Sequence, residues 1–592
     1  MLELTAPAAL RPDVFPVHPL GSQARVLLTS VFGPYARDDE YGSRAINPME
    51  LYHNQVTRLQ GIFSLRMFHR SWGIMLIQAN IQASCNLLDF PTLERFVEEI
   101  RSHPYDVVGI SSIIPNVGKV ARMCELVREH LPRASLVVGG HVANLPGLGH
   151  RVGADHVVRG DGVRWFRRYL GEDEARPIRH PVVASSVGAW TMGVRLADRC
   201  RSTAAALIPS VGCPLGCDFC STSAMFGGKG RSVAFYDRAD DLFSVMCGIE
   251  RTLGVRSFFV MDENFLLYRA RALRLLELMR AHAKAWALYV FSSANALRLY
   301  RAEELVALGV SWVWLGLEGR DAAYAKLRRV HTRSLVRGLQ AHGIRVLGSS
   351  IIGLPEHTPE SIDGTIEDAV VHATEFHQFM LCTPIPGTPL HAEHLEKGTL
   401  LDERDCPLAD AHGQLRFNYR HPHIHGGRET EYLLEAFRRD FARNGPSVVR
   451  IARTLLRGWR RHKDHRDPRV RERYRRECRD LPTLYAGALW AAQRWLAPDA
   501  SLAARVGAVR RAIDREFGLK ARLAGPLVGR FLLSAMRREA RRLGRGRTYE
   551  PPTFYETNRP GAGRRHRKDP RLGRWVEPSP RAAEGSRLPA RA

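Results

Sequence analysis

The stretch Val211-Gly-Cys-Pro-Leu-Gly-Cys-Asp-Phe-Cys-Ser-Thr222 carries three cysteines on one short loop, in the spacing C-x3-C-x2-C. A structural zinc site and a fully cysteine-ligated four-iron cluster each take four ligands, so three cysteines complete neither. A [4Fe–4S] cluster held by Cys213, Cys217 and Cys220 keeps one iron open to a small molecule. A zinc knuckle that borrows a histidine, or three unrelated cysteines, are the alternatives for this loop.

The size and composition of the chain set broad limits. At 592 residues it is long enough for two or three domains with large cores. Its ten cysteines show no paired, regular framework, which together with the cysteine loop indicates a reducing compartment. Residues 1–19 lack the apolar core of a secretory signal, and no apolar stretch approaches the roughly 20 residues of a membrane-spanning helix. We therefore expect a cytoplasmic protein.

The formal net charge is +26, and basic patches attract the phosphates of nucleic acids. Arginine carries nearly all of this charge, which is concentrated after about residue 435 rather than around the cysteine loop. This excess of arginine over lysine, together with many alanines and glycines, is as typical of the composition of a genome as of selection for phosphate contacts. We therefore do not expect a nucleic-acid partner.

The N-terminal part of the chain has the pattern of parallel βαβ units. After a tail over 1–20, short β-branched runs alternate with helical periodicity through 21–175. The expected strands are 26–30, 105–111, 135–141 and 155–161, and the expected helices are 92–102 and 120–130. This pattern predicts a doubly wound, Rossmann-like parallel sheet, which binds ligands at the carboxyl ends of its strands.

A second domain is expected over 204–395, after a linker over 176–203. Six strand candidates recur there with helix-length spacing, at 204–210, 255–264, 286–295, 310–318, 344–353 and 378–383. Polar residues gather at the carboxyl end of each run, where a (β/α) barrel builds its active site. The sequence therefore predicts an α/β protein in which the first sheet is followed by a partial (β/α)6 TIM-like barrel.

The cysteine loop, with the aromatic Phe219 before its last cysteine, resembles that of the radical SAM superfamily. Ile352-Gly-Leu-Pro-Glu-His-Thr358 and Thr383-Pro-Ile-Pro-Gly-Thr-Pro-Leu390 are similar to two further segments of that family, in the expected order. The resemblance implies a [4Fe–4S] cluster whose open iron chelates S-adenosylmethionine. It also implies that an electron from the cluster cleaves this ligand to a 5′-deoxyadenosyl radical.

The same resemblance implies ligand contacts at the strand ends. The candidate residues are Asp262, Glu263, Asn264, Ser293, Asn295, Glu318 and Gly353. The first three stand where the family meets the methionine amino group, and a carboxylate suits an ammonium partner. The next two stand where it meets the substrate or the polar half of the ligand, the glutamate where it meets the ribose, and the glycine beside the adenine. Taken singly, each of these contacts is a weak signal, because an acidic residue at the end of a strand is more often a helix N-cap than a ligand contact.

Cys382 lies in the sixth expected strand. Some radical SAM enzymes use an additional cysteine as a radical relay or methyl carrier. A cysteine inside a buried strand is more often a small apolar filler, which is the interpretation we favour here.

The first domain resembles the cobalamin-binding domain that precedes many radical SAM cores. Ser111 and Ile113 match its Ser-x-Leu loop, and Gly139 and Gly140 match its Gly-Gly turn, where absent side chains let the backbone approach the nucleotide tail. The Asp-x-His-x-x-Gly loop, whose histidine ligates cobalt in other cobalamin proteins, is missing. We expect cobalamin binding without that histidine, and a degenerate sheet without a cofactor is the alternative.

The last third of the chain turns helical and arginine-rich, which predicts a helical domain over 396–556. Residues 557–592 contain few large apolar residues and are expected to form a disordered basic tail. The amphipathic stretch 527–547 is suited to peripheral contact with an anionic membrane, with Phe531, Leu532 and Met536 inserted. An ordinary helix packing its apolar stripe on the barrel is the favoured alternative.

Together these observations predict a cobalamin-dependent radical SAM enzyme, a transferase that methylates an unactivated carbon of a lipid or secondary metabolite. The resemblance implies an electron donor such as flavodoxin or ferredoxin, besides the small-molecule or lipid substrate. A radical SAM enzyme for carbon–carbon coupling or cyclisation without methyl transfer is the first alternative. A non-catalytic cofactor-binding sensor is the second.

Overall fold

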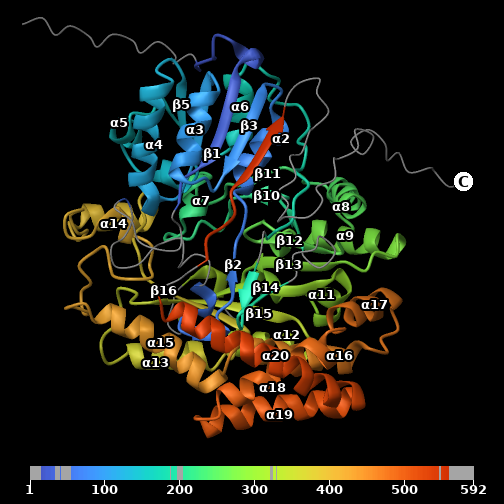
Figure 1. Ribbon diagram of the computed structural model, residues 1–592. Coiled ribbons are helices and arrows are strands. Elements are labelled where there is room, and N and C mark those ends of the chain that lie inside the picture. Colours follow the sequence, from blue (N-terminus) through green and yellow to red (C-terminus); the bar gives the residue numbers. More distant parts are fainter. Residues whose placement is uncertain are drawn as a thin grey trace, which may run out of the picture.

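The computed structural model describes residues 15–33, 41, 55–186, 189–196, 204–319, 324–327, 330–545 and 549–558. Figure 1 shows three layers: the N-terminal sheet with its helices in blue, a second sheet in green and yellow, and a block of orange and red helices. The expected basic tail lies outside the described residues except at its first two positions, which belong to a strand. Among the described helices, none is long and apolar enough to cross a lipid bilayer.

The first sheet has the strand order β17-β3-β1-β4-β5-β6. Its parallel strands are β1 (Arg25–Ser30), β3 (Ser84–Asp89), β4 (Val107–Ser111), β5 (Ser135–Gly139) and β6 (His156–Val157). Its helices are α2 (Trp72–Asn80), α3 (Leu93–Ser102), α4 (Val117–His130), α5 (Leu148–Val152) and α6 (Gly162–Tyr169). Successive residues of β1 enter opposite cores: Leu27 faces one, whereas Val26 and Leu28 face the other. Burial on both faces explains the continuous apolar run in the sequence.

Two strands of this sheet have no counterpart in the sequence prediction. β3 contains the polar residues Asn86 and Asp89, which hide its strand signal although both are buried. The Asn86 side chain donates to the hydroxyls of Tyr105 at 2.5 Å and Tyr555 at 2.8 Å, so the buried amide is paired. Tyr555 belongs to β17 (Phe554–Asn558), which pairs antiparallel with β3 and returns the C-terminal part of the chain to the first domain.

The second sheet has the order β16-β15-β14-β13-β12-β9, with every neighbouring pair parallel. The strands are β9 (Ala205–Leu207), β12 (Ser257–Val260), β13 (Ala287–Ser292), β14 (Val310–Glu318), β15 (Arg345–Ile352) and β16 (Phe376–Leu381). The connecting helices are α8 (Ala239–Leu253), α9 (Arg269–Ala281), α10 (Ala294–Leu297), α11 (Ala302–Leu308), α12 (Thr332–Ala341) and α13 (Ile362–Val370). Strands in sequence order with intervening helices confirm the predicted partial, TIM-like barrel.

The expected linker is partly structured. β7 (Ala189–Thr191) and β8 (Val194–Leu196) form a small antiparallel sheet with β2 (Arg66–Met67), and residues 187–188 and 197–203 lie outside the described residues. β10 (Ser210–Val211) and β11 (Val233–Ala234) pair as a two-stranded ribbon around the cysteine loop. Short β-strands with small and polar residues give no apolar run, so the sequence shows a linker there.

The C-terminal region is helical, as predicted. Its helices are α14 (Pro389–Glu396), α15 (Arg428–Asn444), α16 (Ser447–His462), α17 (Pro468–Glu477), the π-helical turn η9 (Leu481–Tyr485), α18 (Ala486–Trp495), α19 (Ala500–Phe517) and α20 (Leu519–Leu543). Two buried ion pairs connect these helices to each other and to the second sheet. Arg450 of α16 donates to Asp440 of α15 at 2.7 Å, and Arg345 on β15 donates to Glu477 of α17 at 2.8 Å. In α17 both exposed and buried positions carry arginine, so no apolar stripe marks this helix in the sequence.

Candidate active site between the two domains

The cysteine loop connects β10 to the short helix α7 (Ser221–Met225). Cys220 is the N-cap of α7, and its Sγ accepts a hydrogen bond from the Ser223 backbone N–H at 3.5 Å. The Ser223 hydroxyl donates to the Cys213 carbonyl at 2.8 Å. Both ends of the loop are therefore tied to the start of one helix, with all three thiols free and half-buried.

The three thiols lie within electrostatic reach of one another. The pKa of Cys213 is raised to about 11, chiefly by burial; hydrogen bonding to the Leu215 backbone opposes this shift, and the charges of Cys217 and Cys220 add to it. Within the described residues, no three His, Cys, Asp or Glu side chains are already spaced to hold a metal ion. Three thiols are nevertheless the donor set that iron–sulfur clusters take. Ligation of a cluster by these cysteines therefore stays a prediction, and their donor chemistry agrees with it.

Two of the polar strand-end residues are occupied by protein partners. The Asp262 carboxylate accepts hydrogen bonds from the Ser210 hydroxyl and from Arg271 of α9, each at 2.6 Å, in a fully buried ion pair. The Asn264 side-chain amide donates to the Ser293 hydroxyl at 2.9 Å, and its oxygen accepts the Ser293 N–H at 3.0 Å. These residues join Ser210, the first residue of β10, to the carboxyl ends of β12 and β13.

Glu263 differs from its two neighbours. Its Oε2 is buried and has no hydrogen-bond partner among the described residues. Burial raises the pKa of Glu263 to about 7, and the charge of Asp262 acts in the same direction, whereas hydrogen bonding to the Gly212 backbone opposes the shift. Gly212 immediately precedes Cys213 in the loop. A buried, partly unpaired carboxyl group beside the cysteines is suited to a cationic ligand.

Glu318, at the end of β14, holds a backbone φ of 54°, a conformation that non-glycine residues rarely adopt. Its carboxylate forms an ion pair with Lys326. The Lys326 ammonium lies 5.0 Å from the Phe219 ring, and the Tyr324 ring packs edge-on against Phe219 at 5.1 Å. The sequence analysis missed Lys326, although it is one of only eight lysines in the chain. A cation therefore lies directly over the cysteine loop.

The other strand-end candidates have mixed surroundings. Asn295 retains a buried side-chain oxygen without a partner among the described residues. Gly353 has a φ of 73°, and a Cβ there would lie 2.3 Å from the Phe417 ring. Packing against Phe417 thus requires the glycine, independently of any adenine. Cys382 is buried in an apolar cluster with Leu354 and Leu390, which fits the filler interpretation.

The candidate residues of the first domain meet at the carboxyl edge of its sheet. Ser111 pairs with Gly139 in the register of β4 and β5. Gly140 follows with a φ of 80°, and a Cβ there would lie 2.5 Å from the Ser112 carbonyl oxygen. Ile113 is the N-cap of the 3-10 turn η4 (Ile114–Asn116). These residues bring bare backbone to the edge where open parallel sheets bind ligands.

We expect Gly140→Ala to destabilise the first domain by roughly 1–3 kcal/mol, because a side chain at positive φ is strained and meets the Ser112 carbonyl. Urea unfolding of the variant and the wild type measures this difference. Gly149→Ala is the matched control, because its nearest neighbour stays at 3.5 Å and its φ is ordinary. An equal loss in both variants would contradict this assignment.

The two candidate edges face each other directly. His141 follows the Gly-Gly turn in η5 (His141–Asn144), and its Nε2 is 3.0 Å from the Thr222 hydroxyl, two residues after Cys220. Asn144 donates to the Ser221 carbonyl at 3.1 Å. Burial lowers the pKa of His141, so the ring is neutral at physiological pH. The Gly-Gly turn and the cysteine loop are thus held together by neutral hydrogen bonds.

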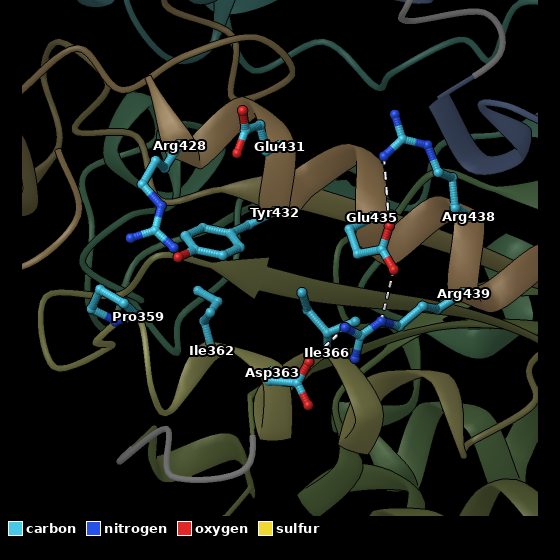
Figure 2. Close-up of a pocket in the computed structure, with 10 residues that line it drawn as sticks. All are labelled: Pro359, Ile362, Asp363, Ile366, Arg428, Glu431, Tyr432, Glu435, Arg438 and Arg439. Atoms are coloured by element: carbon cyan, nitrogen blue, oxygen red, sulfur yellow. Dashed lines mark hydrogen bonds and ion pairs between the residues drawn. The ribbon is translucent and has the colours of Figure 1, made fainter. Parts of the chain in front are cut away.

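A separate groove of about 530 Å³ lies between α13 and α15, on the outside of the barrel. Figure 2 shows Arg439 between Asp363 and Glu435, at 2.5 and 2.9 Å, with Arg438 also paired to Glu435. The groove contains none of the predicted site residues, and these charged side chains pair with one another. We therefore place the candidate site at the domain junction.

Comparison with known families agrees with this placement. Residues 62–170 match the B12 binding domain family, and residues 207–369 match the radical SAM superfamily. An uncharacterized methyltransferase, PH0819, of Pyrococcus horikoshii is 26% identical over 200 residues, 33% of this chain and 43% of the relative. Bacteriochlorophyllide d C-12(1)-methyltransferase of Chlorobaculum tepidum is 28% identical over 196 residues, 32% of this chain and 42% of the relative. The chain thus matches less than half the length of either protein.

A solved structure of the radical S-adenosylmethionine methyltransferase TsrM from Kitasatospora setae, with cobalamin and a [4Fe–4S] cluster bound, is 16% identical. It covers 77% of this chain and 99% of its own, with a TM-score of 0.48. The two family matches contain the Gly-Gly turn and the cysteine loop respectively. The chain therefore contains one segment that matches the B12 binding domain family and, after it, a second segment that matches the radical SAM superfamily.

Proposed function

We propose that the protein is a cobalamin-dependent radical SAM methyltransferase that acts on an unactivated carbon of a lipid or secondary metabolite. The observation that carries this proposal is the direct junction of the two cofactor edges. His141 and Asn144 of the B12-binding domain hydrogen-bond the first turn after the cysteine loop. A junction this close supports two cofactors acting on one substrate, and relatives named as methyltransferases support methyl transfer.

When bound, the cluster supplies the electron that cleaves S-adenosylmethionine, and cobalamin supplies the methyl-transfer chemistry. In this proposal Cys213, Cys217 and Cys220 hold the cluster, and Glu263 receives the ammonium of S-adenosylmethionine. Asp262 positions this region through Arg271. The expected roles of the remaining candidates, Asn264, Ser293, Asn295, Glu318 and Gly353 toward S-adenosylmethionine and Ser111, Ile113, Gly139 and Gly140 toward cobalamin, belong to the same proposal.

The proposal is tested by anaerobic purification with iron, sulfide and hydroxocobalamin, followed by counting each cofactor per chain and assaying 5′-deoxyadenosine after reduction. We expect a four-iron cluster, one cobalamin, and turnover with a small reductant protein such as flavodoxin or ferredoxin. A cluster without cobalamin would favour coupling or cyclisation chemistry. Cofactor binding without cleavage of S-adenosylmethionine would favour the sensor.

Peripheral membrane contact is part of this proposal, and the helix α20 supports it. Its four side chains Leu519, Leu523, Leu527 and Phe531 recur every four residues and are 70, 65, 71 and 61% exposed. The exposed charges on α20 are all basic: Lys520, Arg522, Arg530, Arg537, Arg538 and Arg541. The expectation that Leu532 and Met536 insert was wrong, because both pack into the core at 2 and 0% exposure. The exposed apolar stripe begins instead at Leu519, the first residue of the helix, and ends at Phe531.

We expect Leu527→Asp to lower co-sedimentation with phosphatidylserine-containing vesicles by about tenfold, because burying a leucine is worth roughly 1.5–3 kcal/mol. A salt titration should leave a fraction bound in the wild type, since apolar insertion is not screened. Leu395→Asp is the matched control, because Leu395 is 64% exposed on α14. Equal vesicle binding by both variants would remove the stripe from the proposal. If vesicle binding by the wild type fell steeply to zero as salt was added, the attraction would be purely electrostatic.

A further inference from the structure

A short segment of the C-terminal region reaches into the junction between the two domains. The turn η8 (Leu408–Asp410) packs against η4, and Leu408 contacts the core of the B12-binding domain. The chain then follows β16, where the Leu381 N–H donates to the Gly413 carbonyl at 2.8 Å. Asp410 and His412 therefore lie between the loop that follows β4 and the carboxyl end of a barrel strand.

Both side chains present a buried polar atom without a partner among the described residues. Asp410 is 8% exposed with Oδ1 unpaired, and Nε2 of His412 is likewise buried and unpaired. The Gln414 N–H donates to Nδ1 of His412 at 3.1 Å, which leaves the proton of the neutral ring on Nε2. Burial lowers the pKa of His412 to about 4, so the ring is neutral at physiological pH. The pair thus offers one acceptor and one donor.

We propose that Asp410 and His412 bind a carboxamide at the rim of cobalamin, as contacts supplied from outside the B12-binding domain. A primary amide has a carbonyl that accepts from Nε2–H and an NH₂ group that donates to Oδ1, so it complements the pair. The corrin ring carries such acetamide and propionamide groups around its edge. This inference rests on the proposed function, because it requires cobalamin at the carboxyl edge of the first sheet.

A third unpaired atom lies in the same junction. Asn144 donates to the Ser221 carbonyl through Nδ2, whereas its buried Oδ1 has no partner among the described residues. Buried polar groups are nearly always satisfied in folded proteins. Unpaired atoms on η5, on η8 and at His412 therefore indicate a polar group that completes the junction. A corrin rim presents several amides at once and is suited to this arrangement.

The test is a titration of the full-length, cluster-reconstituted protein with hydroxocobalamin, followed by absorbance. We expect Asp410→Leu and His412→Phe each to weaken binding by about tenfold, because each leaves a bound amide group unpaired. His412→Gln keeps a donor and should recover part of the affinity. Asp402→Leu and His423→Phe alter exposed residues of the same region and should bind like the wild type.

A second probe reports on the carboxylate of Asp410 directly. A cobalamin in which one rim amide is hydrolysed to a carboxylic acid should bind the wild type more weakly than hydroxocobalamin. Asp410→Asn, which removes the opposing charge but keeps the shape, should reduce that discrimination. Iron–sulfur absorbance and the thermal unfolding temperature verify that each variant is folded.

The outcomes separate this inference from the function on which it rests. If the wild type binds no hydroxocobalamin, the cobalamin-dependent function fails and the inference fails with it. If the wild type binds and the folded Asp410→Leu and His412→Phe variants bind equally well, the inference alone is overturned. Unchanged discrimination in Asp410→Asn would overturn the role of the carboxylate.

Discussion

We expect replacement of Cys213, Cys217 and Cys220 by alanine to abolish the iron–sulfur absorption at roughly 400 nm that thiolate-bound clusters give. Three thiols on one loop are the donor set that such a cluster takes, although within the described residues no three His, Cys, Asp or Glu side chains are already spaced to hold a metal ion. Because these ligands act together, each single alanine variant should also lose most of its iron. Anaerobic reconstitution, with iron and sulfide counted per chain, measures the effect.

Two controls separate ligation from folding in this experiment. Cys382→Ala should retain a full cluster, because Cys382 is buried in an apolar cluster. Cys220 also caps α7, so a Cys220→Ser variant keeps a hydrogen-bond acceptor at that position while removing the thiolate. A triple variant that retained its full iron content, or a Cys220→Ser variant that kept the cluster, would refute the assignment.

Much of the fold was predictable because local patterns dominate in its parallel strands. β1, β4 and β5 are buried on both faces, and such strands appear as apolar runs in any sequence. β3 was not predictable, because its polar Asn86 can be buried only by hydrogen bonding to hydroxyl groups that are distant in sequence, one of them on β17. A strand that joins a sheet from the far end of the chain has no local signal.

The candidate site shows the same division. The spacing of the cysteines and the order of the strand ends are properties of the sequence, and both could be recognised directly. Which carboxylate is already occupied is a property of packing: Asp262 is bound by Arg271, whereas the adjacent Glu263 keeps an unpaired oxygen. Lys326 was missed for a similar reason, because only the folded loop brings it to Glu318.

We expect Glu263→Gln to stabilise the ligand-free protein at alkaline pH and to weaken binding of S-adenosylmethionine. The pKa of Glu263 is raised from 4.5 to about 7 by burial. The folded protein holds this proton more tightly than the unfolded chain does. The wild type is therefore most stable below pH 4.5, where the group is protonated in both states, and it loses free energy of unfolding as the pH rises from 4.5 through 7. Glutamine stays neutral, so the variant should gain on the order of 3 kcal/mol over the wild type above pH 7.

Urea unfolding between pH 5 and 8.5 measures this gain, which should be small at pH 5 and largest at pH 8.5. Binding should change in the opposite direction, because the glutamine lacks the charge that pairs with an ammonium. We expect the affinity for S-adenosylmethionine to fall by roughly tenfold or more, since a hydrogen bond to a charged group contributes about 1.5–3 kcal/mol.

Glu396→Gln is the matched control for both measurements, because Glu396 is an exposed residue of α14. If Glu263→Gln left both the pH dependence and the affinity unchanged, Glu263 would be a spectator and the ammonium would require another partner. A stability gain with unchanged affinity would confirm the buried carboxyl group and exclude its role in binding, so the two measurements decide separately between the electrostatic description of the site and its proposed use.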